Sequence, residues 1–240
     1  DFRSSDGLYS KVKHKYSDTF RMGKDLFDAC LLTTHGSINA FNHLMGVLRE
    51  CILNATPTET HKFIKKLADM EKLKRVYTQN IDNLEELVGL HIDWQFEKVK
   101  NNKAQVVQLH GTLAKLRRNI CTNIYDFTLQ FCDIFKQGKA PKCTKCEERG
   151  KKCLDQTRKV SSYNWTAKSD NIKALIKDFA RAVHNHNGYV ILVNATDVVT
   201  KEWNSLIDFQ IEGDCDEWVK LVNIELLNVK KMTTTRLSKN

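Results

Sequence analysis

The chain has 240 residues, of which 41% are hydrophobic and 28% are charged, and its formal net charge at pH 7 is +9. This composition is typical of a folded protein with one main core and excludes a disordered chain. No run approaches the roughly 20 apolar residues of a membrane-spanning helix, so we expect no contact with a membrane. The positive charge favours an acidic partner, but the lysines are spread along the chain, which predicts only weak, non-specific binding to nucleic acid.

Helices are predicted over most of residues 20–75, because apolar residues recur there at helical spacing. A buried strand then starts at Val76 and gives way to a polar run that ends at Asp82. Polar side chains directly after a parallel strand lie where open α/β sheets bind ligands, although Asn and Asp also form ordinary turns and helix caps. A second strand, over 106–109, ends in a similar way at His110.

In the second half, an amphipathic helix is predicted over 171–188, an apolar strand over 189–194, and a strand, polar turn and final helix over 205–222. Strand, polar turn and helix thus occur three times, which predicts an α/β fold with a doubly wound, mostly parallel, Rossmann-like sheet. The segment 117–158 lacks periodicity, is basic and cysteine-rich, and predicts a small inserted module. The expected domains are 1–116 for the first part of the Rossmann-like domain (with a helical insertion at about 20–75), 117–158 for the module and 159–240 for the second part.

The eight cysteines predict reduced thiols rather than a disulfide framework. Cys30, Cys51 and Cys215 have core-like neighbours and are expected to be buried. Cys143 and Cys146 form a Cys-x-x-Cys pair, the spacing of a structural zinc site, although a module of reduced thiols without zinc is the alternative. The five cysteines that crowd into the module and point to metal are Cys121, Cys132, Cys143, Cys146 and Cys153.

Several segments together carry a resemblance to a known family: DFRSSDGLY at the start, YTQNID and QLHG after the two strands, and VILVN and EGDCDEWV further along. They resemble the sirtuin family of NAD-dependent protein lysine deacylases, in the right order and over nearly the whole chain. FARAVHNHNG and other segments resemble the fungal nuclear branch that acts on histones. The resemblance implies an enzyme of the nucleus that removes acetyl groups from lysines of histone tails or core. The implied products are nicotinamide and O-acetyl-ADP-ribose.

The resemblance also implies a role for each residue of the candidate site. His110 matches the histidine that takes a proton from a ribose hydroxyl, a task that suits a side chain titrating near neutrality. Asn80 and Asp82 match the residues that hold the nicotinamide ribose and carboxamide of NAD. The other implied NAD contacts are Gln79 at the ribose, Phe2 and Arg3 in the loop over the nicotinamide pocket, and Asn194 and Cys215 beside adenosine. A structural role for His110 and a core position for Phe2 are the alternatives.

Sirtuins hold a structural zinc ion with two Cys-x-x-Cys pairs, and the pair described above matches one of them. Cys121 matches the first cysteine of the other pair, but Ile124 stands where its partner belongs. The expected ligand set is therefore the matching pair with Cys121 and a fourth thiol, Cys153 or Cys132.

Three family elements have no match in this sequence. The glycine-rich segment that wraps the phosphates of NAD is expected before Asp1, and a peptide-binding segment is expected after Arg158. NWTAK stands where a phosphate-binding turn belongs, so a central strand is predicted to be lost as well. Asn83 replaces a glycine that commonly follows NID, a mild change because asparagine tolerates left-handed backbone geometry. The chain is therefore predicted to be a deacetylase or, alternatively, a non-catalytic sirtuin-like scaffold; an ordinary dehydrogenase is disfavoured because no G-x-G-x-x-G follows a strand.

Overall fold

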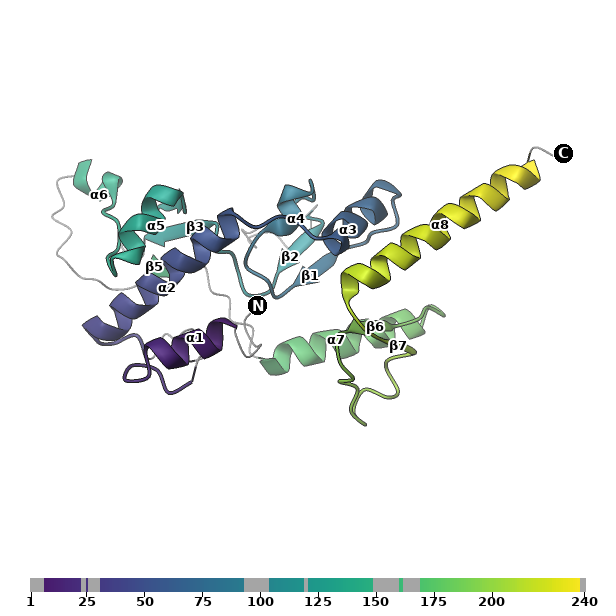
Figure 1. Ribbon diagram of the computed structural model, residues 1–240, viewed down its shortest axis with the longest axis horizontal. Helices are drawn as coiled ribbons and strands as arrows, with labels where there is room; N and C mark the ends of the chain where they lie inside the picture. The colour runs from purple at the N-terminus through teal and green to yellow at the C-terminus, as the bar shows by residue number, and fades with distance from the viewer. Residues whose placement is uncertain are drawn as a thin grey trace. The chain divides into compact units, whose positions relative to one another are not determined.

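A computed structural model of the protein describes residues 7–22, 25, 31–92, 104–118, 121–148, 160–161 and 169–237. The chain forms two compact units, whose elements are labelled in Figure 1. The first unit comprises Asp1–Ala55 and Gly111–Asn164, and the second comprises Thr56–His110 and Trp165–Asn240. The helices before residue 55 therefore fold with the cysteine-rich segment, whereas the predicted boundaries place them with the first strands.

The first unit is organised around the long helix α2 (His35–Leu53), which packs along α5 (Leu129–Lys136). Figure 1 shows the two helices side by side. Gly46 allows this close approach, because a Cβ atom at that position would lie 2.9 Å from the backbone of α5. The rings of Phe127 and Phe135, both fully buried, lie 4.8 Å apart beside this contact. The packing of α2 on α5 is the physical reason why the helix belongs to this unit.

A three-stranded antiparallel sheet with the order β4-β3-β5 completes the core of the first unit. The hairpin formed by β3 and β4 brackets Cys121, and α6 carries Cys146, so these elements position the candidate metal ligands. The remaining elements of this unit are α1 (Leu8–Lys15), β3 (Lys115–Arg118), β4 (Ile124–Asp126), α6 (Thr144–Glu148) and β5 (Val160–Ser161).

In the second unit, the first two strands form a parallel pair. Their register joins Val76 to Val106 and Thr78 to Gln108, so both strands end at the same level. Val106 is fully buried in a small apolar cluster against which residues of α3 pack. The elements of this part are α3 (Glu59–Asp69), β1 (Val76–Thr78), α4 (Leu84–Leu87) and β2 (Val106–Gln108).

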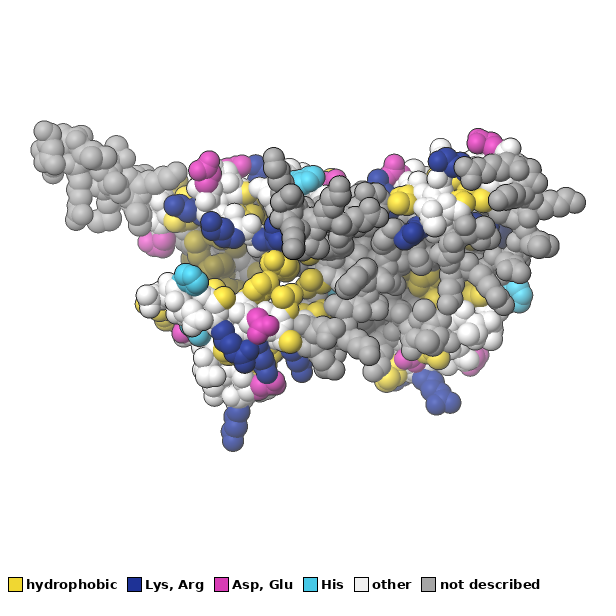
Figure 2. All heavy atoms as spheres, turned by 180° about the vertical axis from the view of Figure 1, so that it is seen from behind, with side chains coloured by type: hydrophobic (Ala, Val, Ile, Leu, Met, Phe, Trp, Pro, Cys, Tyr) yellow, Lys and Arg dark blue, Asp and Glu magenta, His cyan; other side chains and the backbone are white. Residues whose placement is uncertain are grey.

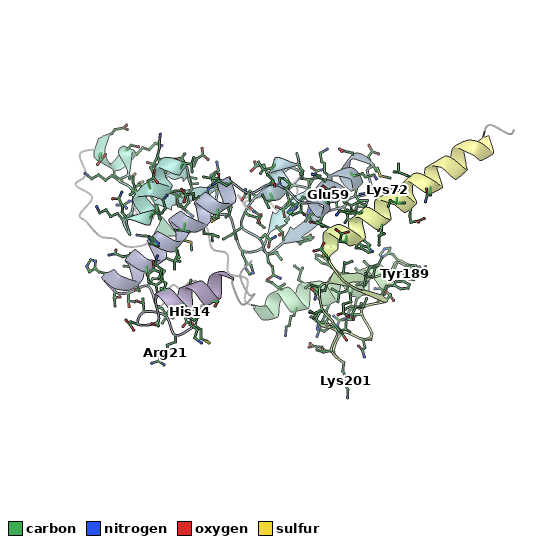
Figure 3. The ribbon with its side chains drawn as sticks, in the orientation of Figure 1. His14, Arg21, Glu59, Lys72, Tyr189 and Lys201 are labelled. Carbon is green, nitrogen blue, oxygen red and sulfur yellow. The ribbon has the colours of Figure 1, made fainter. Side chains whose placement is uncertain are left out.

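A second parallel pair follows, and it lies between two helices in the chain. Tyr189, which is 71% exposed and labelled in Figure 3, meets the ring of Phe209 edge-on at 5.6 Å. The last helix packs on α3, where the rings of Phe63 and Trp218 lie 6.2 Å apart. The elements of this part are α7 (Ser169–His184), β6 (Ile191–Asn194), β7 (Phe209–Glu212) and α8 (Cys215–Leu237).

Among the described residues, the two parallel pairs are separate sheets. The sequence predicted one sheet and also the loss of a central strand. The structure shows two parallel pairs in place of the single predicted sheet, and no described strand joins them. The strands and helices otherwise fall in the predicted order.

Individual boundaries differ from the predicted ones for local reasons. The helix after the polar run, α4, is short and ends at Leu87, because Gly89 adopts a positive φ of 85° that stops the helix. The strand expected over 189–194 begins two residues later, because the backbone N–H of Val190 donates to the carboxylate of Asp208 at 2.7 Å.

The surface of the described chain bears on three further expectations. No described helix combines the length and the apolar character needed to span a bilayer. On the face shown in Figure 2, lysine and arginine side chains occur in small separate groups.

Cys51 and Cys215, expected to be buried, are exposed because each lies at the end of a helix, and Cys30 lies outside the described residues.

Candidate functional site

The first candidate site lies where β1 and β2 end. The two strands are parallel and in register, and the Leu109 N–H donates to the Thr78 carbonyl oxygen at 2.8 Å, which carries the pairing one residue beyond the strands. Gln79 and His110 therefore emerge at the same edge, although 31 positions separate them. The Gln79 Oε1 atom lies 3.1 Å from the His110 Nε2 atom. The structure thus brings these two predicted site residues into direct contact.

This contact determines what His110 can do. With the Gln79 oxygen as acceptor, Nε2 carries the hydrogen, and Nδ1 is the ring nitrogen that can take up a proton. His110 is half-buried, and desolvation lowers the pKa of its imidazole. A lower pKa keeps the ring neutral near pH 7, which is the form a general base requires.

The polar turn after β1 has a defined conformation. The Asn80 N–H donates to the Thr78 hydroxyl at 3.0 Å, and the Asn80 side chain is exposed. Asp82 accepts a hydrogen bond from the Leu84 N–H at 3.2 Å and so starts α4. Asn83 has a φ of 62°, which confirms that asparagine tolerates the left-handed geometry expected at this position. Asp82 therefore has a structural task as a turn residue, and its contact with a cofactor remains a proposal.

The residues expected beside adenosine follow the second strand pair. Asn194 ends β6, and its side-chain amide donates to the Thr196 carbonyl oxygen at 2.8 Å. Cys215 begins α8, and its thiol lies 3.8 Å from the Val193 carbonyl oxygen. The structure therefore places Asn194 and Cys215 at the same end of β6. Phe2 and Arg3, the other two residues expected to contact the cofactor, lie outside the described residues.

A separate cluster of thiols lies in the first unit. The Sγ atoms of Cys121, Cys143 and Cys146 lie within 4.8 Å of one another, and Cys121 and Cys143 are 3.5 Å apart. Four thiolates around a zinc ion, each about 2.3 Å from it, are separated from one another by distances of this size. The three thiols therefore fit three corners of a tetrahedral site.

The fold reduces the number of candidates for the fourth zinc ligand. Cys132 is fully buried in α5 and does not belong to the group of thiols, so this alternative is corrected. Its place is fixed by the packing of α5 on α2, which holds it away from the metal ligands. Cys153 lies outside the described residues and stays the proposed fourth ligand. Ile124 is half-buried in β4, where it cannot ligate a metal.

The surroundings of Cys143 favour its thiolate form. Burial alone raises the pKa of the thiol, but hydrogen bonds from the Tyr125 hydroxyl, the Cys146 backbone and Cys121 outweigh burial and lower the pKa to about 7. The Tyr125 hydroxyl lies 3.1 Å from the sulfur. Thiolates bind zinc and thiols do not, so this arrangement suits metal binding.

Two residues that sequence reasoning assigned no role support the first site. Gln108 ends β2 and donates from Nε2 to the Asn83 side-chain oxygen at 3.1 Å. Glu85 lies in the first turn of α4 and is only 3% exposed. Each is a polar residue at a position where the spacing of the neighbouring apolar residues predicts an apolar side chain. This mismatch was the signal that the sequence offered.

The sequence is similar to that of a known protein family and to those of several fungal proteins. The Sir2 family model matches residues 1–199. The chain is 34% identical to NAD-dependent histone deacetylase HST3 of Candida albicans over 273 residues, covering 94% of this chain and 56% of that protein. It is 31% identical to NAD-dependent histone deacetylase HST3 of Saccharomyces cerevisiae over 275 residues, covering 94% of this chain and 61% of that protein.

The solved structure described as "The Structural basis of Sirtuin Substrate Affinity" shares the fold, with a TM-score of 0.61 at 18% identity, covering 94% of this chain and 86% of that one. The predicted α/β, Rossmann-like fold class is thereby confirmed. The chain spans about three-fifths of the length of the two HST3 proteins. Both alignments are longer than the chain itself, so these relatives contain internal residues without a counterpart here.

Proposed function

The chain belongs to the Sir2 family, and on that premise we propose that it is an NAD-dependent protein lysine deacetylase. Its proposed substrates are acetylated lysines of histone tails or core, and its proposed location is the nucleus, because two fungal relatives are named histone deacetylases. The observation that carries the proposal is the contact between Gln79 and His110 at the shared edge of β1 and β2.

The described residues fit a nucleotide cofactor at this edge. A half-buried neutral imidazole and the exposed Asn80 amide follow two parallel strands, the position where open α/β sheets bind such ligands. NAD, when bound, supplies a ribose carbon from which nicotinamide departs and to which the acetyl oxygen is transferred. The proposed NAD contacts of this chain are Phe2, Arg3, Gln79, Asn80, Asp82, Asn194 and Cys215.

His110 is the proposed catalytic residue. It would take a proton from a ribose hydroxyl at Nδ1, while Gln79 holds Nε2 and fixes the plane of the ring. Asn80 and Asp82 would orient the ribose and carboxamide, and their turn is anchored by hydrogen bonds within the chain before any ligand arrives. This anchoring supports their role, since a preorganised turn loses little entropy on binding.

Zinc is the proposed structural metal of the first unit. Cys121, Cys143 and Cys146 would hold it together with Cys153. The ion would supply folding free energy to a module with few regular elements, without contact with the reaction.

The test is nicotinamide release from NAD in the presence of an acetylated histone peptide. The wild-type chain and His110→Ala are compared, with His91→Ala as the matched control, because His91 is an exposed histidine of the same unit. We expect release by wild type and His91→Ala and loss of release in His110→Ala. Equal rates in wild type and His110→Ala would remove His110 from the mechanism.

A non-catalytic sirtuin-like scaffold is the second candidate function. It is favoured by the internal residues that the relatives have and this chain lacks, and by the separation of the two strand pairs. If wild type binds no NAD and releases no nicotinamide, the scaffold replaces the enzyme. For either function we propose only weak, salt-sensitive binding to nucleic acid, and tight DNA binding at high salt would contradict it.

A further inference from the structure

Gln108 is a buried polar side chain beside the candidate active site. It is the last residue of β2, is 1% exposed, and lies on the same buried face as Val106, because side chains two residues apart in a strand point to the same side. Its Oε1 atom has no hydrogen-bond partner among the described residues. Natural proteins pair nearly all buried polar atoms, and an apolar side chain at this position would carry no such cost. Stability therefore does not explain a glutamine here.

The hydrogen bond of the Gln108 side chain connects the end of β2 to the turn that follows β1. The Gln108 Nε2 atom donates to the Asn83 Oδ1 atom at 3.1 Å, across 25 positions of the sequence. Asn83 stands at the start of α4 with a φ of 62°, and its side chain makes no capping hydrogen bond to that helix. The Asn83 oxygen thus accepts from β2 instead of capping its own helix.

This contact lies between the residues of the proposed mechanism. Gln108 precedes His110 by two residues, and Asn83 closes the turn that carries Asn80. The contact between Gln79 and His110 joins the same two segments at a second point, also at 3.1 Å. Two side-chain hydrogen bonds therefore fix the separation between the turn and the proposed base.

We propose that Gln108 is a positioning residue for the candidate active site, because its hydrogen bond to Asn83 sets the distance between the turn that orients the cofactor and the His110 imidazole. Gln108 acts through Asn83 and needs no contact with NAD. Turnover depends steeply on such a distance, since a misplacement of about 1 Å can cost about 100-fold in rate. This inference rests on the proposed function, in which His110 is the base.

The main test compares kcat, KM for NAD and the melting temperature, with an acetylated histone peptide as the second substrate. Gln108→Leu removes the donor together with the unpaired buried oxygen, and the half-buried Asn83 oxygen can bind water instead. The melting temperature should therefore stay the same or rise, while kcat falls about tenfold or more. KM for NAD should change less than kcat, because every proposed NAD contact is retained.

Changes at Asn83 test the same hydrogen bond from its other side. Asn83→Gly removes the acceptor and keeps the left-handed backbone, so it should lower kcat by a similar factor. The double variant Gln108→Leu/Asn83→Gly should lose no more than either single variant, because both remove one hydrogen bond. Asn83→Asp keeps an acceptor oxygen and tolerates a positive φ, so it should recover most of the kcat that Asn83→Gly loses.

The matched control is Gln105→Leu, at the opposite end of β2. The Gln105 Oε1 atom accepts a hydrogen bond from the His91 N–H at 3.0 Å, so this variant also loses one glutamine hydrogen bond from the same strand region. Its kcat should stay at the wild-type value. An equal fall of kcat in Gln105→Leu and Gln108→Leu, or an unchanged kcat in folded Gln108→Leu, overturns the inference.

Hydrogen exchange tests the positioning without NAD. The backbone N–H groups of Asn80 and Leu84 donate hydrogen bonds within the turn, at 3.0 and 3.2 Å. In Gln108→Leu both should exchange about fivefold faster, the factor that one neutral hydrogen bond represents. The Leu109 N–H, which donates at 2.8 Å in the strand pairing, should exchange at the wild-type rate.

The exchange result keeps the two proposals separate. A wild-type chain that releases no nicotinamide refutes the proposed function, and exchange in the turn then decides whether Gln108 holds it. Unchanged exchange in the turn of folded Gln108→Leu overturns the inference. If Gln108→Leu does not fold, Asn83→Gly and Asn83→Asp decide by the same measurements.

Discussion

The thiol cluster of the first unit and the strand-end site of the second unit assemble their side chains by different means. Cys121 lies between two strands of a hairpin and Cys146 lies in a five-residue helix, so the elements around the cluster are short. Gln79 and His110, in contrast, follow two strands whose parallel register sets their positions. At the strand ends the backbone hydrogen bonds place the side chains, whereas the thiols need a partner that binds all of them.

Because the two sites are assembled differently, we expect them to lose their function in different ways. A metal site assembled from short elements loses its fold when the metal is removed, because zinc binding supplies the folding free energy. A site built on a parallel strand pair keeps its fold when a single side chain is removed and loses only the chemistry of that side chain. The two units should therefore respond differently to perturbation.

The largest expected effect is the loss of the metal. Purified protein should contain about one zinc per chain, and a chelator should unfold the first unit, since zinc contributes about 10–16 kcal/mol in small zinc-binding peptides. Cys143→Ser should also lose the metal, whereas Cys51→Ser, at an exposed cysteine, should change stability by less than about 0.5 kcal/mol. Metal analysis and thermal melts check both statements, and protein without zinc after purification under reducing conditions would refute the site.

His110→Ala should have the next largest effect, on rate and not on fold. Loss of a general base costs about 10²–10⁴-fold in rate, while NAD affinity and melting temperature should change little. Because burial lowers the pKa of His110, the wild-type rate should persist below the ordinary histidine pKa of about 6.5 before it falls with decreasing pH. A pH–rate profile that falls already above pH 7 would contradict the assignment.

Gly46→Ala tests the packing of the first unit without touching its thiols. The added methyl group would lie 2.9 Å from the backbone of α5, and relief of that contact should cost about 1–3 kcal/mol. Gly36→Ala, in the same helix, is the matched control, because its Cβ atom would meet nothing closer than 3.9 Å. The control should be neutral or stabilising by up to about 1 kcal/mol. Denaturant melts compare the two, and equal stabilities would show that α2 and α5 can separate.

The smallest expected effect is a pH dependence of stability in the second unit. Because the pKa of Glu85 is raised in the fold, its contribution to stability is fully present below the ordinary glutamate pKa of about 4.3 and is lost as pH rises through the folded pKa. Within that window the slope is at most about 1.4 kcal/mol per pH unit. The difference in unfolding free energy between wild type and Glu85→Gln should therefore change between low and neutral pH. A pH-independent difference would show that Glu85 titrates normally.

Several features were predictable from local sequence because local forces produce them. Apolar periodicity marks α2, α3 and α7, and the polar run from Thr78 to Asp82 marks the end of a strand. The Cys143–Cys146 spacing identified one half of the thiol cluster, and Asn83 was expected to accept its left-handed conformation. The resemblance to sirtuins supplied the roles of the site residues, which composition and periodicity could not.

Other features depend on contacts between residues far apart in the sequence, and only the tertiary structure decided them. The packing of α2 on α5 placed that helix in the first unit and removed Cys132 from the ligand set. Strand register brought Gln79 to His110, and the burial of Glu85 in α4 became visible only in the fold. Local spacing determines periodicity, caps and ligand pairs, whereas burial and long-range contact arise only when distant segments pack, and a single sequence does not specify which segments those are.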